Sequence, residues 1–267
     1  MRIPTLATLL FLAAAWLVCA AETGIAPTGT LRAAYIVSNL AQAVKDPTTG
    51  RFRGVSTDIA KELGRRNQIP VTILPVANAA AVLEAVQKGQ ADIGFVAPNP
   101  ERMGIVLYSQ IYMLVQQSFL VRENSPITSV KEIDRPGRNI GANMGDSVAV
   151  YLKSWLKQAT LVLSPDFSLK EASLWLTDGR VDAFGGNRQR LRVSTQDIPG
   201  LRLLPDNLYG VPQAIAVSKD KPELLTAIDK AIDELRSSGF LSDAVKRSGV
   251  DGIAVAPPVK QQPEGSK

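Results

Sequence analysis

An arginine placed just after a buried strand is the residue of this sequence best suited to chemistry. The run Ala91–Val96 is apolar apart from Asp92 and predicts a buried strand, which ends at Pro98 and Pro100 because proline lacks the amide that a sheet interior needs. Arg102 follows, beyond the carboxyl end of the strand, where open α/β sheets bind ligands. Its guanidinium offers five donors in a rigid fork that suits a carboxylate or a phosphate. A solvated loop arginine is the alternative interpretation.

Two absences limit the chemistry that is open to the chain. The sequence has no histidine, and its single cysteine, Cys19, lies in the N-terminal apolar stretch. The rest of the chain therefore cannot form Cys/His zinc sites, a thiolate nucleophile, a Ser-His-Asp triad or a disulfide. We expect no catalytic residue, no metal and no cofactor.

The first residues have the pattern of an export signal. Arg2 supplies a positive start, Ile3–Val18 is mostly apolar, and Cys19-Ala20-Ala21 gives a small-x-small cleavage pattern. We expect cleavage after Ala21, with Ala20 as the alternative, and a periplasmic location. An uncleaved anchor is the competing interpretation, but the stretch barely reaches spanning length.

Charge and hydropathy exclude two classes of protein. Without Arg2, 29 basic residues stand against 25 acidic ones, so the net charge falls from +5 to +4. This charge is spread along the chain, whereas nucleic-acid binding usually shows a concentrated basic stripe, and we expect no nucleic-acid partner. No second long apolar segment follows the first, which argues against an integral membrane protein.

Strands and helices alternate in two successive series. The first predicts strands over Leu31–Val37, Val71–Val76 and Ala91–Val96, with helices over Ser56–Arg66 and from the cap Asn78 to Lys88. The second predicts strands over Arg138–Asn143, Leu161–Leu163, Val181–Phe184 and Leu201–Leu204, with helices over Asp146–Gln158, Ser168–Gly179 and Asn187–Ser194. Such alternation indicates an α/β fold with mostly parallel sheets covered by helices on both faces.

A short internal echo relates the two series. Val86–Asp92 resembles Leu176–Asp182, and each is a helix end, a glycine and a buried strand opened by an aspartate. The matching positions favour two similar lobes over a chance match. Asp92 and Asp182 are interpreted as turn or cap residues rather than ligand contacts.

Two long β-prone segments, Met113–Glu123 and Leu208–Ser218, are candidates for the links between such lobes. Strands that cross in this way can act as a hinge. A late helix is predicted over Pro222–Ser238, with Asp220 as its cap. The expected organisation is a signal peptide over 1–21, lobe 1 over 22–116 and 212–250, lobe 2 over 117–211, and a disordered tail over 251–267.

The chain resembles the extracellular solute-binding proteins of family 3, which include amino-acid-binding components of bacterial ABC importers. The resemblance covers Gly29 to about Gly249 and implies a two-lobed type II periplasmic-binding-protein fold with a two-strand hinge. It rests on six motifs in the family's order, namely Gly29–Arg32, Gly54–Ala60, Gly89–Asp92, Pro100–Arg102 with Tyr108-Ser109 and Tyr112, Ile140-Gly141 with Gly145–Ser147, and Gly179–Ala183.

The resemblance implies roles for particular residues. Arg102 would hold the α-carboxylate of the ligand, and the amides of Asp146 and Ser147 would face the same group from the start of a helix. Arg188 and Gln189 are either added donors or solvated loop residues. The implied partners are a small solute that carries a carboxylate and an inner-membrane ABC permease, with the protein a monomer. The remaining candidate ligand contacts are Ala97, Asn99, Asn187 and Asn39.

Several positions depart from the family's pattern. Acidic residues that commonly meet an α-ammonium are replaced near Ile36 and Asn187, and the usual aromatic sandwich is replaced by Asn39 and Gln42. Asp146 stands where Ser or Thr is usual, and it could contact an ammonium or cap its helix, the more frequent role. Solutes without a conventional ammonium partner therefore stay open.

Two alternative functions remain open at this point. Cyclohexadienyl dehydratases share the fold, but without histidine their acid–base work would fall to a carboxylate such as Asp146 or Glu101, and no catalytic pair stands out. The other alternative is a freestanding ligand-binding module of a sensor.

Overall fold

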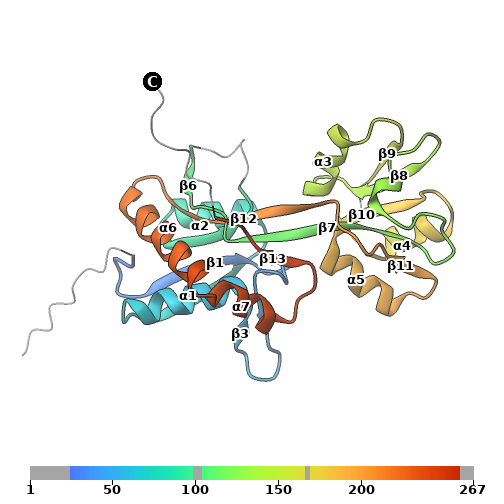
Figure 1. Ribbon diagram of the computed structural model, residues 1–267. Helices are drawn as coiled ribbons and strands as arrows, with labels where there is room; N and C mark the ends of the chain where they lie inside the picture. The colour runs from blue at the N-terminus through green and yellow to red at the C-terminus, as the bar shows by residue number, and fades with distance from the viewer. Residues whose placement is uncertain (1–24, 99–103, 166–168, 259–267) are drawn as a thin grey trace, which may run out of the picture.

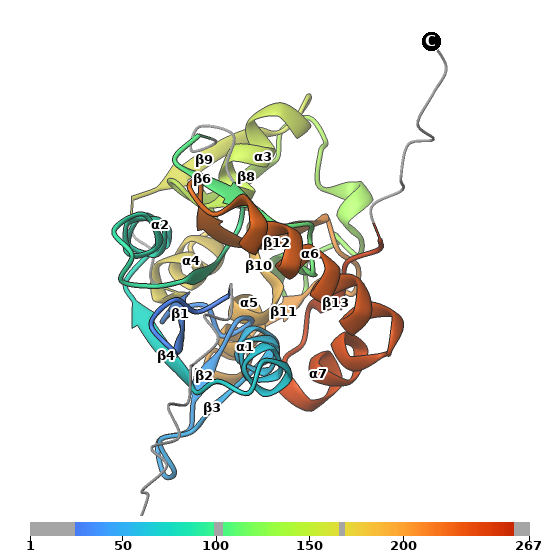
Figure 2. The ribbon, with the colours of Figure 1, turned by 90° about the vertical axis from the view of Figure 1, so that its left-hand side faces the viewer.

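The computed structural model describes residues 25–98, 104–165 and 169–258 of the chain. Its elements gather in two groups, called lobe 1 and lobe 2 below, and two long strands run from one group to the other (Figure 1). Figure 2 shows the molecule turned so that lobe 1 is in front of lobe 2. The signal peptide predicted over 1–21 lies outside the described residues. The lobe boundaries stay a prediction.

Lobe 1 is built on a parallel sheet in the order β4–β1–β5. Alternate residues of β1 face two cores, because Leu31 and Ala33 pack with α1, α6 and α7 while Ala34 packs with α2. Both faces of the sheet are therefore covered, as the apolar strand sequences require. The elements of this lobe are β1 (Leu31–Ile36), the hairpin β2 (Val44–Lys45) and β3 (Phe52–Arg53), α1 (Val55–Arg66), β4 (Val71–Val76), α2 (Ala79–Gln87), β5 (Ile93–Val96), β6 (Val106–Tyr108), α6 (Pro222–Ser237) and α7 (Phe240–Ser248).

Lobe 2 repeats this plan on a parallel sheet in the order β9–β8–β10. Its main core lies between the sheet and α3, and a second core lies under α4 and α5. The elements of this lobe are the 3-10 turn η2 (Val130–Glu132), β8 (Asn139–Asn143), α3 (Ser147–Trp155), β9 (Thr160–Ser164), α4 (Leu169–Thr177), β10 (Ala183–Asn187), α5 (Arg188–Asp197) and β11 (Leu201–Leu203).

The two lobes share a pair of antiparallel strands, β7 (Met113–Arg122) and β12 (Tyr209–Ser218). The second half of β12 pairs with β5 of lobe 1, whereas the second half of β7 pairs with β10 of lobe 2. Each strand therefore begins in one lobe and ends in the other (Figure 1). A third short strand, β13 (Ile253–Val255), pairs with the start of β7.

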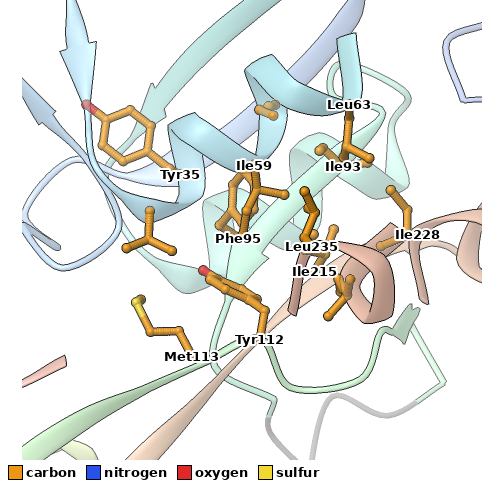
Figure 3. Close-up of a cluster of buried hydrophobic side chains, with 14 of the residues drawn as sticks. Tyr35, Ile59, Leu63, Ile93, Phe95, Tyr112, Met113, Ile215, Ile228 and Leu235 are labelled. Atoms are coloured by element: carbon orange, nitrogen blue, oxygen red, sulfur yellow. The ribbon is translucent and has the colours of Figure 1, made fainter. Parts of the chain in front are cut away.

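The core of lobe 1 extends to the start of this crossing (Figure 3). Tyr112, directly before β7, is fully buried and meets the ring of Phe95 edge to face, with centroids 5.8 Å apart. Its hydroxyl is 2.8 Å from that of Ser56 on α1, and burial raises the pKa of the Tyr112 phenol. The hinge strand β7 thus starts directly after a residue that is packed into the core of lobe 1.

The internal echo corresponds to the same contact in both lobes. The Asp92 carboxylate accepts the backbone amide of Arg32 at 2.9 Å, and the Asp182 carboxylate accepts the backbone amide of Asn139 at 2.9 Å. Each aspartate thereby fixes the start of the neighbouring parallel strand. Asp92 also receives two bonds from the Arg32 guanidinium, at 2.8 and 3.1 Å.

The structure differs from the sequence expectations at three elements. Helix α7 was not predicted: it begins directly after Gly239, whose positive φ of 81° ends α6 and turns the chain into a new helix. The cap of α6 is Lys221 without a side-chain bond, so the prediction of Asp220 was wrong. Disorder was predicted from residue 251, yet Ile253–Val255 form β13 because β7 offers them a free edge.

Candidate functional site

A cleft of about 480 Å³ lies between the lobes, within the range of small-molecule sites. The carboxyl ends of β1, β5 and β10 and the turn after β8 open onto it, as expected for ligand sites in parallel sheets. Its floor is formed by the two crossing strands. The lining residues are Ile36, Ser38, Asn39, Leu40, Ala79, Val96 and Ala97 from lobe 1, Val115, Gln117, Val211 and Gln213 from β7 and β12, and Gly145, Asp146, Ser147, Asn187, Gln189, Arg190 and Val193 from lobe 2.

The structure brings five of the seven predicted site residues together at this cleft. Asn39 and Ala97 line it from lobe 1, and Asp146, Ser147 and Asn187 line it from lobe 2. The other two, at positions 99 and 102, lie outside the described residues. The contacts of all seven with a ligand stay predictions.

Asn39 and Gln42 serve the local fold in different ways. The Asn39 side-chain oxygen accepts the amide of Ala41 at 3.2 Å, which closes a turn after β1. Gln42 is fully buried, and its amide bonds the backbone at Ile36 and Phe95. Among the described residues that line the cleft, none is aromatic; Asn39 is one of them and Gln42 is not.

Asp146 occupies the N-cap position of α3, but its side chain makes no capping hydrogen bond. The interpretation of this carboxylate as a cap was therefore wrong. Its Oδ2 instead accepts the side-chain amide of Asn143 at 3.2 Å and lies 3.9 Å from Nη1 of Arg190. Burial raises the pKa of the Asp146 carboxyl, while the Asn143 bond and the Arg190 charge oppose that shift.

Ser147 is the first residue of α3, and a hinge strand holds its side chain. Burial raises the pKa of the Tyr209 phenol, and a hydrogen bond with the Ser147 side chain opposes that rise. Tyr209, on β12, also stacks on Tyr151 of α3 with centroids 4.0 Å apart and an interplanar angle of 12°. Helix α3 is thus fixed to the crossing strand β12 through two contacts.

Asn187 caps the other helix at the cleft, α5. Its side-chain oxygen accepts the backbone amides of Gln189 at 3.0 Å and Arg190 at 3.3 Å. The N-termini of α3 and α5 therefore both reach the cleft wall, and helix N-termini favour negative charge.

Arg188 and Arg190 separate to different sides of α5. Arg188 is nearly buried and donates to the carbonyl of Leu204 at 2.9 Å and towards Asp251 at 3.3 Å, so it supports the fold rather than the cleft. Arg190, which was not among the predicted residues, lines the cleft together with Gln189. Two residues along a helix turn by about 200°, so Arg188 and Arg190 point to nearly opposite sides of α5.

A family model described as bacterial extracellular solute-binding proteins, family 3, matches residues 38–248. The glutamine-binding protein of Geobacillus stearothermophilus is 25% identical over 182 residues, which cover 66% of this chain and 68% of that protein.

Solved structures show the same fold. The amino acid ABC transporter substrate-binding protein AbpA from Streptococcus pneumoniae, solved bound to L-arginine, matches with a TM-score of 0.61 and 24% identity over 82% of this chain and 94% of that one. The ancestral amino acid-binding protein AncCDT-1, described as a precursor of cyclohexadienyl dehydratase, matches with a TM-score of 0.61 and 22% identity over 82% and 94%.

Proposed function

Because the chain belongs to the bacterial extracellular solute-binding proteins of family 3, we propose that it captures a small carboxylate-bearing solute, an amino acid or a related compound, for an ABC-type permease. The predicted family and the type II periplasmic-binding-protein fold are confirmed. The relatives named above are binding proteins, and the dehydratase alternative gains no stronger support from them.

One observation carries the proposal: two helix N-termini, those of α3 and α5, reach a single cleft between two lobes. The start of α3 has no side-chain cap, and the positive end of the dipole of each helix favours a carboxylate at that wall. In the proposal Arg102, which follows β5 in the sequence, supplies the main charge contact. The other proposed ligand contacts are Asn39, Ala97 and Asn99 from the first half of the chain and Asp146, Ser147 and Asn187 from lobe 2.

Capture works by closure of the lobes in this proposal. A ligand that touches both walls binds the closed state better than the open one, so it shifts the population by the difference in affinity. Strands β7 and β12 are the two connections that would bend. The closed monomer then presents both lobes to the permease. Light scattering at working concentration tests the monomer, and pull-down of a permease rather than a sensor protein tests the partner.

The proposed location is the periplasm, reached by cleavage of the signal over 1–21. Support comes from the extracellular nature of the family. Among residues 25–98, 104–165 and 169–258, no helix is long and apolar enough to cross a membrane. N-terminal sequencing of protein from the periplasmic fraction should begin at Glu22, or at Ala21 for the alternative cleavage. Recovery of the intact N-terminus in the membrane fraction would overturn the proposal.

The central test is binding by the Arg102→Ala variant. A thermal-shift screen of amino acids, opines, keto acids and other small carboxylates identifies the solute, since bound ligand raises the melting temperature. Loss of a buried charge contact costs about 2–5 kcal/mol, so calorimetry should show affinity more than tenfold weaker. Arg51→Ala, which changes an exposed arginine of the same lobe, should bind like wild type. Unchanged affinity in Arg102→Ala would sink the assignment.

A further inference from the structure

The cleft wall of lobe 2 carries one acid and one base side by side. Asp146 and Arg190 are the charged side chains among the described residues that line the cleft, and they lie 3.9 Å apart. Their side chains are 30% and 38% exposed, so both are open to a ligand. In the same described part of the chain the other polar groups of the cleft are neutral hydroxyls and amides.

Contacts within the fold leave most of the hydrogen-bonding capacity of the Asp146 carboxylate unused. It makes no cap bond to α3, and a carboxylate can accept about four hydrogen bonds, of which the Asn143 amide uses one at 3.2 Å. The Arg190 guanidinium is too distant for a hydrogen bond, and partly exposed pairs of this kind are weak. A ligand cation can therefore displace Arg190 at little cost.

A second acceptor lies beside this carboxylate. Asn143 is 95% buried, since only 5% of it is exposed, and its Oδ1 has no hydrogen-bond partner in the described part of the chain. The Nδ2 of the same side-chain amide donates to the Asp146 carboxylate. Because Nδ2 and Oδ1 are bonded to the same carbon, the unpaired oxygen lies close to that carboxylate. Buried hydrogen-bond acceptors are rarely left unpaired, and a donor that enters next to Asp146 would give Oδ1 of Asn143 a partner.

We propose that Asp146 binds a cationic ammonium group of the solute, so that the protein selects a zwitterion over the corresponding carboxylate anion. The inference rests on the proposed function, in which Arg102 and the helix N-termini take the carboxylate. An anion without an ammonium would meet the Asp146 charge unpaired, and like charge next to a bound carboxylate is unfavourable. Asp146 is then the determinant that separates amino acids from keto acids.

The test compares matched pairs of probes by calorimetry: L-leucine with 4-methyl-2-oxopentanoate, L-alanine with pyruvate, and L-glutamate with 2-oxoglutarate. Wild-type protein should bind the amino acid of the responding pair at least tenfold more tightly than its keto acid. Asp146→Asn should lose at least tenfold for the amino acid and keep or improve binding of the keto acid. Asp146→Glu keeps the charge and should retain part of the preference.

Two further variants separate this role from a general effect. Asp178→Asn removes the same charge from an exposed site in the same lobe and should leave both affinities unchanged. Arg190→Gln removes the competing cation and should bind the amino acid a few times more tightly than wild type, and weaker binding would contradict the competition.

The outcomes distinguish the inference from the function beneath it. If Asp146→Asn binds the amino acid like wild type, or if wild type binds both members of a pair equally, the inference fails while the carboxylate-binding function stands. If no member of any pair binds to folded protein, the proposed function fails and the inference fails with it. Circular dichroism of each variant confirms that the chain is folded.

Discussion

The side-chain nitrogen of Gln42 lies 3.0 Å from the side-chain oxygen of Gln213, and both residues are buried. The same nitrogen donates to the carbonyl of Phe95 at 3.1 Å, and the Gln42 oxygen accepts the amide of Ile36 at 3.1 Å. One side chain therefore joins the loop after β1, the end of β5 and the crossing strand β12. These three segments form the lobe 1 side of the cleft and part of its floor.

Gln42→Leu should destabilise the protein by roughly 2–4 kcal/mol, because it leaves several buried polar groups unpaired at once. Urea denaturation measures this loss, and calorimetry should show weaker solute binding because the loop that carries Asn39 is no longer fixed. Gln90→Leu, at an exposed position of lobe 1, should change the free energy of unfolding by less than about 0.5 kcal/mol. Equal stability of the two variants would contradict the role given to Gln42.

The two echo aspartates should differ in their contribution to stability. The Asp92 side chain is fully buried and paired with Arg32, whereas the Asp182 side chain is 37% exposed and lies 3.7 Å from Arg122. We expect Asp92→Ala to cost roughly 3 kcal/mol, because it leaves a partly buried guanidinium and an amide without a partner. Asp182→Ala should cost about 1 kcal/mol. A lower melting temperature for Asp182→Ala than for Asp92→Ala would refute this comparison.

Tyr209→Phe should weaken solute binding several-fold with a stability loss of only about 1 kcal/mol. The variant keeps the stack on Tyr151 but loses the hydrogen bond with the Ser147 side chain. Binding is measured by calorimetry with the solute found in the thermal-shift screen. Tyr151→Phe serves as the control, since it preserves both the stack and the Ser147 contact. If Tyr209→Phe binds the solute as tightly as the control, the hydrogen bond between Tyr209 and Ser147 does not contribute to solute binding.

Glu62 should make part of the stability of lobe 1 depend on pH. The Arg65 guanidinium binds its carboxylate at two distances of 2.7 Å and Arg66 at 2.9 Å, which lowers the pKa of Glu62 to about 2. A carboxyl with a lowered folded-state pKa stabilises the protein above its ordinary value of 4.5. That contribution is lost as the pH falls from 4.5 towards 2.

Glu62→Gln should therefore cost about 1 kcal/mol at pH 7, and the difference from wild type should shrink below pH 4.5. Urea denaturation at pH 7, 4 and 3 measures how the free energy of unfolding of each protein depends on pH. Glu84→Gln is the control, because its partner Lys88 is exposed and the change should have a smaller effect at every pH. A Glu62→Gln deficit that is constant from pH 7 to pH 3 would refute the pairing.

Much of the fold follows from local sequence rules. The apolar runs predict β1, β4 and β5, and Asn78 caps α2 as expected by accepting the amide of Ala81 at 3.0 Å. Within each lobe, parallel strands place their carboxyl ends at one edge of the sheet, and β1 and β10 run in opposite directions along the shared strand order. The two edges therefore face one cleft, which Asn39 and Asn187 both line.

Side-chain direction in the site did not follow from the sequence. Asp146 stands at a cap position, yet the Asn143 amide and the Arg190 charge, which become neighbours only after folding, draw it away from the helix. The choice between Arg188 and Arg190 depends on Asp251, which lies 63 residues beyond Arg188 in sequence. Local patterns predict where a helix starts, but they contain no information about such distant partners.

The last described strand, β13, pairs with one of the two strands that cross between the lobes. Strand β13 lies along the start of β7, and Asp251, just before it, contacts Arg188 at 3.3 Å and Arg192 at 2.5 Å on α5 of the other lobe. A load applied after Val255 would therefore act on β7 and, through Asp251, on α5. If the proposed closure occurs, we expect an affinity tag or a surface tether attached close to this strand to change the torsional stiffness of the hinge, and with it the solute concentration at which the lobes close.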